Sequence, residues 1–257
     1  MGVLCELEDF FLCFNGEKGQ IGRSVEGRPI YFFKIEKTAF PKVIVQYGIH
    51  AREHITCRLA LKQILEFEKT GKCGSVYFIP ALNPDGIVIA QNYQPLYKAN
   101  ARSVDLNVNF DARWGTGQKN TIVPSAENYI GNFAFSEPET IALRDFTLKV
   151  KPNATISYHS KGEEIYYHFH QKGKREKRDK ALAQLISKST GYAIKNTLGS
   201  AGGYKDWCVE KLKIPAFTIE VGSDNLKHPI GKEHLQEIFY KNKSVINVLT
   251  ENLSGNN

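Results

Sequence analysis

Short apolar runs alternate along the chain with helical patterns of apolar and polar residues. The runs are rich in Val, Ile, Tyr and Phe, which favour strands. They occupy Ile30–Ile35, Val43–Tyr47, Val76–Ile79, Thr155–Tyr158, Ile165–Phe169 and Ala216–Val221. The helical patterns occupy Ile55–Lys69, Pro138–Val150, Asp179–Thr190 and Lys232–Leu253, with Ser136 as the expected N-cap of the second. This alternation predicts an α/β fold with a mixed, mainly parallel twisted sheet flanked by helices.

The segment from Asn92 to Ser136 interrupts this alternation, because it is poor in regular patterns and rich in Asn, Gly and Asp. Long irregular segments in a compact domain are usually functional loops. Open α/β sheets bind ligands at the carboxyl ends of their strands. Since His50, His159 and Glu220 each follow or end a predicted strand, we expect one crevice to contain all three.

The size and composition of the chain are those of an ordinary globular enzyme. Its 257 residues suit one large α/β domain or two small ones, and 42% of them are hydrophobic and 24% charged. No apolar run reaches the length that is needed to span a bilayer, so we expect no membrane insertion. We expect one catalytic domain over residues 1–257, with its core motifs in 22–222.

The formal net charge of +7 could indicate nucleic acid, an anionic surface or an acidic substrate. The densest basic run, Lys172–Lys180, contains two acidic residues. Aromatic residues do not interleave with it, as they do on surfaces that bind single-stranded nucleic acid. We therefore interpret the run as the solvated start of a helix and expect no nucleic-acid partner.

The five cysteines are odd in number, and no pair has the C-x-x-C spacing, so we expect reduced thiols rather than a disulfide framework. The segment Met1–Phe14 carries Glu6, Glu8 and Asp9 and has no basic start, so it does not resemble a signal peptide. Both observations predict a cytoplasmic protein.

A candidate metal site begins at His50, directly after a predicted strand. Glu53 follows at the i+3 position, so the imidazole and the carboxylate can point to one site. This pair of ligand types suits zinc, and catalytic zinc sites often draw a third ligand from far along the chain. An H-x-x-E spacing alone is weak, and His54 is a competing ligand in the same turn, shifted by one position.

The surrounding residues resemble the carboxypeptidase A-like family of zinc metallocarboxypeptidases. The resemblance begins with Gly48–Thr56 and continues, in the order that is typical of the family, through six further fragments. These are Asn83–Gly86, Val104–Asn107, Ser157–Ser160, Ala201–Gly203, Asp206–Trp207 and Phe217–Glu220. The resemblance implies one zinc ion per chain, held by His50, Glu53 and His159, with Glu220 as the general base. It also implies that Asp105 hydrogen-bonds the second ring nitrogen of His50.

An amide hydrolase of this kind also needs a cation that stabilises the developing oxyanion. In the family an arginine supplies it. At the matching place this chain has Lys98, and Arg102 is a second candidate nearby. Lysine provides a point charge without the planar fork of arginine. A solvated loop lysine is the alternative interpretation of Lys98.

Three further positions depart from the family pattern. Val108 stands where the family's exopeptidases have an arginine that binds the terminal carboxylate of the substrate. Counting back from Trp207, the family's substrate-capping tyrosine falls at Leu198, and the base of the side-chain pocket falls at Lys205. A lysine there would favour a substrate side chain that carries a carboxylate, although a plain surface lysine is an equal alternative. Arg52 and Asn107 are further candidates for substrate contact.

A basic pocket without the terminal arginine resembles a bacterial branch of the family, whose members cleave γ-D-glutamyl-meso-diaminopimelate bonds in cell-wall peptides. Tyr158–Tyr166 and Gly203–Cys208 also resemble this branch. We therefore predict a zinc peptidase that acts on muropeptides. The alternatives are a carboxypeptidase that binds the terminus through Arg102 or Lys205, and a muropeptide-binding protein without catalysis.

Overall fold

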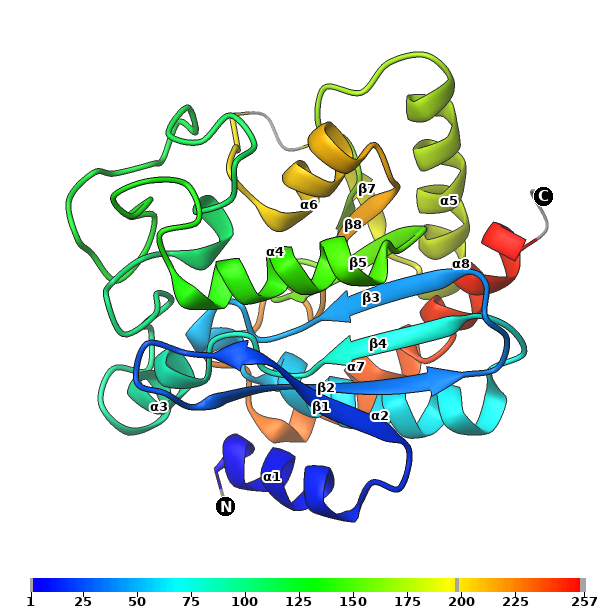
Figure 1. Ribbon diagram of the computed structural model, residues 1–257, viewed down its shortest axis with the longest axis horizontal. Helices are drawn as coiled ribbons and strands as arrows, with labels where there is room; N and C mark the ends of the chain where they lie inside the picture. The colour runs from blue at the N-terminus through cyan, green and yellow to red at the C-terminus, as the bar shows by residue number, and fades with distance from the viewer. Residues whose placement is uncertain (1, 197–198, 255–257) are drawn as a thin grey trace.

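The computed structural model describes residues 2–196 and 199–254 and contains one eight-stranded mixed sheet (Figure 1). The strand order is β1-β2-β4-β3-β5-β8-β6-β7. The strands are β1 (Glu17–Arg23), β2 (Pro29–Glu36), β3 (Lys42–Gln46), β4 (Ser75–Ile79), β5 (Ala154–His159), β6 (Glu164–Tyr166), β7 (Ala193–Lys195) and β8 (Ala216–Glu220).

The centre of the sheet is parallel, as predicted. Strands β4, β3, β5 and β8 pair in parallel, while β1, β2 and β6 join the sheet through antiparallel pairs. All six residues of β5 are buried, which is typical of a parallel strand with both faces covered. The carboxyl ends of β3, β5 and β8 therefore meet at one edge of the sheet.

The helices cover both faces of the sheet (Figure 1). They are α1 (Val3–Cys13), α2 (Ile55–Thr70), α3 (Pro84–Asn92), α4 (Pro138–Val150), α5 (Lys174–Thr190), α6 (Tyr204–Trp207), α7 (Leu235–Asn242) and α8 (Val245–Ser254). Side chains of β3 alternate between two apolar cores, as the period of two in a strand requires. Val43 and Val45 pack with α1, α2, α5, α7 and α8, whereas Ile44 packs with α4 and α6.

Most of the predicted elements are present, and α4 has the predicted bounds. Its N-cap, however, is Glu137 without a side-chain cap, because the Ser136 hydroxyl donates to the Glu137 carboxylate instead. The run that was predicted as a solvated helix start is confirmed, since α5 begins at Lys174. The edge strands β1 and β7 and the helices α1, α3 and α6 were not predicted.

The predicted helix Lys232–Leu253 is wrong in one respect, since it is broken into a 3-10 turn (Lys232–His234) and the helices α7 and α8. The break follows Asn242, whose side chain is completely buried. Its carbonyl accepts a hydrogen bond of 2.9 Å from Gln63 Nε2 on α2. A backbone carbonyl that accepts a hydrogen bond from another helix does not need an N–H donor from the next turn of its own helix, so the helix can end there.

The irregular segment between α3 and α4 forms long loops at one end of the sheet, on the left in Figure 1. Its regular structure is limited to a 3-10 turn at Leu106–Val108 and an isolated bridge between Thr121 and Tyr129. Buried amides hold it in place. The Asn109 side chain donates to the Ile130 carbonyl at 2.8 Å and accepts from the Thr140 hydroxyl, also at 2.8 Å.

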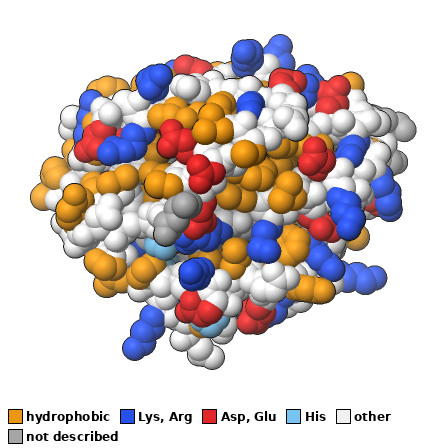
Figure 2. Space-filling view, turned by 90° about the horizontal axis from the view of Figure 1, so that it is seen from below, with side chains coloured by type: hydrophobic (Ala, Val, Ile, Leu, Met, Phe, Trp, Pro, Cys, Tyr) orange, Lys and Arg blue, Asp and Glu red, His pale blue; other side chains and the backbone are white. Residues whose placement is uncertain are grey.

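Neither the length of the described helices nor the charge of the face that carries α1 indicates a membrane or a nucleic-acid partner. In the described part of the chain, no helix is both long and apolar enough to cross a membrane. Figure 2 views the molecule from below and shows Lys and Arg side chains interspersed with Asp and Glu around hydrophobic side chains. The net charge of +7 is therefore not gathered into a continuous basic surface on this face.

Candidate metal centre and active site

Three buried side chains converge where the strands β3 and β5 end. His50 lies in the turn after β3, Glu53 ends the following 3-10 turn (Ala51–Glu53), and His159 is the last residue of β5. The Nδ1 atom of His50 is 2.9 Å from Glu53 Oε1 and 3.0 Å from the Nδ1 atom of His159. The Nδ1 atom of His159 is also 3.2 Å from Glu53 Oε2. One ligand atom from each residue lies within 4.8 Å of the others.

This cluster fits a metal ion better than it fits a closed hydrogen-bond network. Two imidazole nitrogens face each other across 3.0 Å beside a carboxylate. A nitrogen of a neutral imidazole carries either a lone pair or a proton. Two nitrogen lone pairs that point to the same place as a buried carboxylate form a donor set that binds a dication. The pKa of the Glu53 carboxyl is lowered well below its usual value, because the nearby imidazoles outweigh the effect of burial.

Asp105 orients His50 from the opposite side of the ring. Its Oδ1 lies 3.3 Å from His50 Nε2, and it is completely buried. The same carboxylate accepts backbone hydrogen bonds of 3.1 Å from Asn107 and from Asn128. A histidine that donates its second N–H to a carboxylate keeps one tautomer and one ring orientation. The Asp105 carboxylate thus lies at the second ring nitrogen of His50, away from Glu53 and His159.

Lys98, and not Arg102, lies beside the cluster. The Lys98 ammonium is 2.9 Å from Asp105 Oδ2, its side chain is mostly buried, and it lines the cavity at the cluster. Burial alone would lower the pKa of Lys98, but Asp105 and Glu53 raise it. The Arg102 side chain is 56% exposed, and its guanidinium lies 3.8 Å from Glu137. The position of Lys98 excludes the alternative of a freely solvated loop lysine.

Glu220 completes the group at the end of β8. It is paired in register with His159 of the neighbouring strand β5. Burial and the neighbouring Glu53 carboxylate raise the pKa of Glu220 to about 8 against the opposing effect of His159. Glu220 and His159 line one cavity of about 230 Å³, together with His50 and Lys98. The crevice that was expected from the three strand ends is therefore present.

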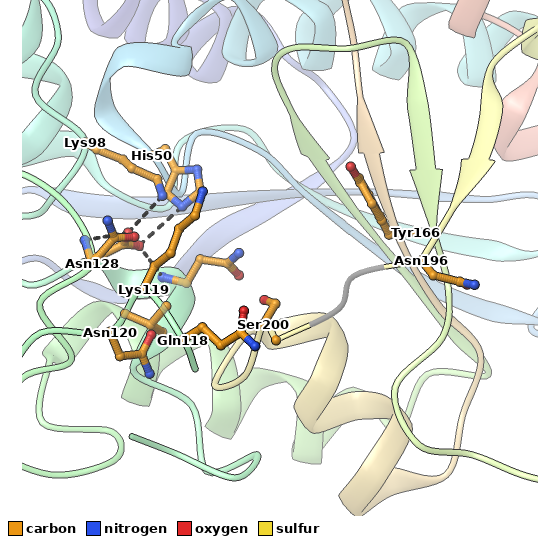
Figure 3. Close-up of a pocket in the computed structure, with 13 residues that line it drawn as sticks. His50, Lys98, Gln118, Lys119, Asn120, Asn128, Tyr166, Asn196 and Ser200 are labelled. Atoms are coloured by element: carbon orange, nitrogen blue, oxygen red, sulfur yellow. Dashed lines mark hydrogen bonds and ion pairs between the residues drawn. The ribbon is translucent and has the colours of Figure 1, made fainter. Parts of the chain in front are cut away.

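A second cavity of about 350 Å³ adjoins the first, and Figure 3 shows its lining. Both cavities share His50, Lys98, Asn107, Tyr166 and Ser200. We call the cavity that contains Glu220 the catalytic lobe and the other the amide lobe, because the amide lobe is rich in Asn and Gln side chains. Those side chains belong to Asn107, Gln118, Asn120, Asn128 and Asn196.

Lys205 lines the catalytic lobe on the side of α6, so the alternative of a plain surface lysine is wrong. It is only 6% exposed. Its ammonium donates to the His168 carbonyl at 2.9 Å, lies 2.5 Å from Asp206 Oδ1 and stands 5.4 Å from the centre of the Phe169 ring. An ammonium has three N–H donors, so one remains for a group in the cavity. The partner Asp206 reduces the net charge that a substrate would meet.

The remaining predicted contacts have different positions. Val108 lines the amide lobe, and Asn107 lines both lobes. The Arg52 guanidinium is paired with Glu127 at 3.3 Å and does not line either lobe. Leu198 lies outside the described residues. His54 is the residue before α2 and is not part of the metal cluster, and burial lowers its pKa to about 4.

Sequence reasoning did not identify Tyr166 and Lys119 as site residues. Tyr166 on β6 lines both lobes, and its hydroxyl donates to the Glu164 carboxylate. Lys119 lies in the irregular segment and lines the amide lobe. Tyr166 reaches the site because β6 pairs with β8, and Lys119 because its loop folds back toward His50. No local pattern marks either residue.

Comparison with known proteins agrees with this geometry. The family model of the zinc carboxypeptidases, peptidase family M14, matches residues 16–252. The chain belongs to this family. Its members are zinc metallopeptidases, and the cluster of His50, Glu53 and His159 can hold one metal ion.

Similar proteins include a gamma-D-glutamyl-diamino acid endopeptidase and carboxypeptidases, such as carboxypeptidase A1 of Bos taurus, which is 28% identical over 240 residues, 79% of this chain and 57% of that protein. Gamma-D-glutamyl-L-diamino acid endopeptidase 1 of Lysinibacillus sphaericus is 29% identical over 175 residues, which are 60% of this chain and 44% of that protein. This chain thus aligns with less than half of that relative's length.

Two solved structures confirm the fold. Bovine thrombin-activatable fibrinolysis inhibitor has a TM-score of 0.84 at 21% identity, covering 99% of this chain and 95% of that one. Murein-tripeptide amidase MpaA of Escherichia coli O157 has a TM-score of 0.67 at 21% identity, covering 91% and 93%.

Proposed function

We propose that this zinc peptidase hydrolyses the amide bond between γ-D-glutamate and meso-diaminopimelate, or a related diamino acid, in muropeptides. One observation carries the proposal: a buried lysine, Lys205, lines the same cavity as Glu220 and the metal cluster. Diaminopimelate differs from most amino acids in carrying a second carboxylate on its side chain. The similarity to a γ-D-glutamyl-diamino acid endopeptidase supports the same substrate class.

The chain's own residues divide the reaction between them. His50, Glu53 and His159 would hold zinc, which supplies a Lewis acid and lowers the pKa of a bound water. Glu220 takes the proton of the attacking water and delivers it to the leaving amine. Lys98 faces the developing oxyanion as a fixed cation, and Asp105 keeps Lys98 charged and His50 oriented.

Substrate contacts are assigned by position. Asn107, which lines both lobes, contacts the substrate backbone, and Val108 leaves the amide lobe without an arginine. The third N–H of the Lys205 ammonium donates to the side-chain carboxylate of diaminopimelate. Arg52 acts on the substrate only through the loop that it holds by its ion pair with Glu127. Arg102 and Leu198 receive no role here.

The catalytic unit is proposed to be the whole of residues 1–257, working in the cytoplasm on imported or precursor peptides. All five cysteines are free, which supports a reducing compartment.

The decisive assay offers zinc-loaded protein two peptides and follows which bond breaks. We expect cleavage of L-Ala-γ-D-Glu-meso-diaminopimelate at the γ-glutamyl bond, and little cleavage of a peptide with a C-terminal hydrophobic residue. Preferential release of the hydrophobic residue would establish an ordinary carboxypeptidase instead. Peptide binding without turnover, together with zinc content near zero, would establish a binding protein.

The role of Lys205 is tested on the substrate rather than on the protein, because removing Lys205 would leave Asp206 buried and unpaired. The matched peptide carries lysine in place of diaminopimelate and lacks only the side-chain carboxylate. We expect its kcat/KM to be lower by about 10- to 100-fold, since a charge-assisted hydrogen bond is lost. Equal kcat/KM values for both peptides would remove Lys205 from the proposal.

A further inference from the structure

The two lobes that meet at the metal cluster contain one lysine each in addition to the shared Lys98. Lys205 lines the catalytic lobe, and Lys119 lines the amide lobe. In Figure 3 the side chain of Lys119 extends from its loop into the cavity, toward His50. The two lysines come from segments that are far apart in the sequence, and they line adjoining halves of one active site.

The charges of the neighbouring cations are already neutralised within the protein. Lys98 is paired with Asp105 at 2.9 Å, and Lys205 with Asp206 at 2.5 Å. In contrast, the side chain of Lys119 has no ion pair or hydrogen bond among residues 2–196 and 199–254. Its ammonium keeps a full charge and three free N–H donors for a group that enters the lobe.

The amide lobe suits a carboxylate at the position where Lys119 lies. Among residues 2–196 and 199–254, the only acidic residue that lines it is Asp105, which already interacts with Lys98 and His50. The side-chain amides of Gln118 and Asn120, on either side of Lys119, offer further N–H donors. Val108, which occupies the expected position of the family's carboxylate-binding arginine, lines this same lobe. A lysine from the irregular segment thus lines the same lobe as the position that lacks the arginine.

We propose that Lys119 is a substrate-binding residue that pairs with the α-carboxylate of a diaminopimelate residue at the C-terminus of the peptide. This inference rests on the proposed function. The site then recognises the two carboxylates of one residue with two lysines, Lys205 for the side chain and Lys119 for the terminus. Peptides that end at diaminopimelate are preferred over peptides that continue beyond it.

The test compares two peptides that differ at one group: L-Ala-γ-D-Glu-meso-diaminopimelate with its terminal α-carboxylate free, and the same peptide with this group as an amide. For the unmodified zinc-loaded enzyme we expect kcat/KM to be on the order of tenfold higher for the free acid, since a charged hydrogen bond is stronger than a neutral one. Because Lys119 is exposed, this preference decreases as salt is added.

Substitutions then assign the preference to one side chain. Lys119→Gln should lower kcat/KM for the free acid on the order of tenfold, mainly through KM, and leave the amide nearly unchanged. Lys119→Arg should retain most of the preference. The matched control is Lys188→Gln, which removes one positive charge from an exposed position on α5 that lies outside both lobes. This variant should leave kcat/KM unchanged for both peptides.

Three results overturn the inference. The first is an unmodified enzyme that cleaves both peptides equally well. The second is a Lys119→Gln variant that loses activity equally on both, which would place the lysine near another part of the substrate. In either case the γ-glutamyl bond is still cut, so the proposed function stands. If the unmodified enzyme cleaves neither peptide, both the proposed function and this inference fail.

Discussion

The metal cluster and the wall that faces the substrate are built in different ways. His50, His159 and Glu220 lie at the ends of three adjacent strands in the buried centre of the sheet. The amide lobe, by contrast, is lined mostly by two loops. One lies between α3 and α4 and is held by side-chain hydrogen bonds of Asn109, and the other lies before α6. A rigid sheet can keep catalytic groups within tenths of an ångström while loops vary the specificity. The metal cluster therefore belongs to the first region, and Val108, the departure that removes the terminal arginine, belongs to the second.

The largest effect that we expect comes from the sheet-anchored region. Glu220→Gln should lower kcat by about 10²- to 10⁴-fold, because the isosteric amide cannot accept a proton. Zinc content, measured by atomic absorption, should not change, since Glu220 is not one of the three clustered ligands. The control is Glu164→Gln on the neighbouring strand β6, which should remain active. Retained turnover in Glu220→Gln would show that another group is the base.

Lys98 connects the two regions, because it comes from the irregular segment and reaches the cluster. Lys98→Gln should lower kcat by about 100-fold, through loss of a fixed charge near the oxyanion. Arg102→Gln, four residues along, should stay within about twofold, because its exposed guanidinium lies beside Glu137 and outside both lobes. Thermal midpoints of both variants check that folding is intact. The opposite order of effects would assign the oxyanion to Arg102.

Val108 tests whether the substrate wall alone decides the class of substrate. Val108→Arg restores, in the amide lobe, a charge that can bind a terminal carboxylate. We expect a gain of a few-fold in kcat/KM on peptides with a C-terminal hydrophobic residue, measured by release of the free amino acid. Val108→Met serves as the control for size without charge. No difference between these two variants would contradict our view of this position.

Glu139 tests whether buried polar groups hold the irregular segment. Its carboxylate is completely buried and accepts hydrogen bonds from the Val25 amide at 3.1 Å and from Asn100 Nδ2 at 3.2 Å. Burial, helped by Glu137, raises its pKa to about 7. Because the folded state holds this proton more tightly than the unfolded state, the stabilisation is full below pH about 4.5 and is lost as the pH rises through about 7.

Denaturant titrations should show this loss as up to about 3 kcal/mol between pH 4.5 and 8. Glu139→Gln has no proton to lose, so its stability curve should be flatter over the same range. An equally steep curve in Glu139→Gln would assign the pH dependence to other groups. Glu68→Gln, at an exposed position on α2, is a control that should keep the original slope.

Local sequence patterns predicted both the centre of the sheet and the edge of the sheet at which His50, His159 and Glu220 lie. The strands β3, β5 and β8 are continuous apolar runs, and ligands at strand ends follow from the geometry of parallel sheets. The edge strand β1 was not predicted, because its sequence Glu17–Arg23 carries alternating polar residues and two glycines without an apolar run. The helix over Lys232–Leu253 was predicted as continuous, because the break at Asn242 depends on Gln63 of a distant helix.

The sequence by itself indicated the fold class through its periodicity, and it indicated the family and the ligand set through the resemblance of ordered fragments such as Gly48–Thr56 and Phe217–Glu220. The tertiary structure decided that Lys98 rather than Arg102 reaches the cluster, and that Lys205 is buried beside Asp206. It also placed Tyr166 and Lys119 at the site, through strand pairing and through a loop that folds back. Such placements depend on which distant segments share one cavity, and no local pattern records that.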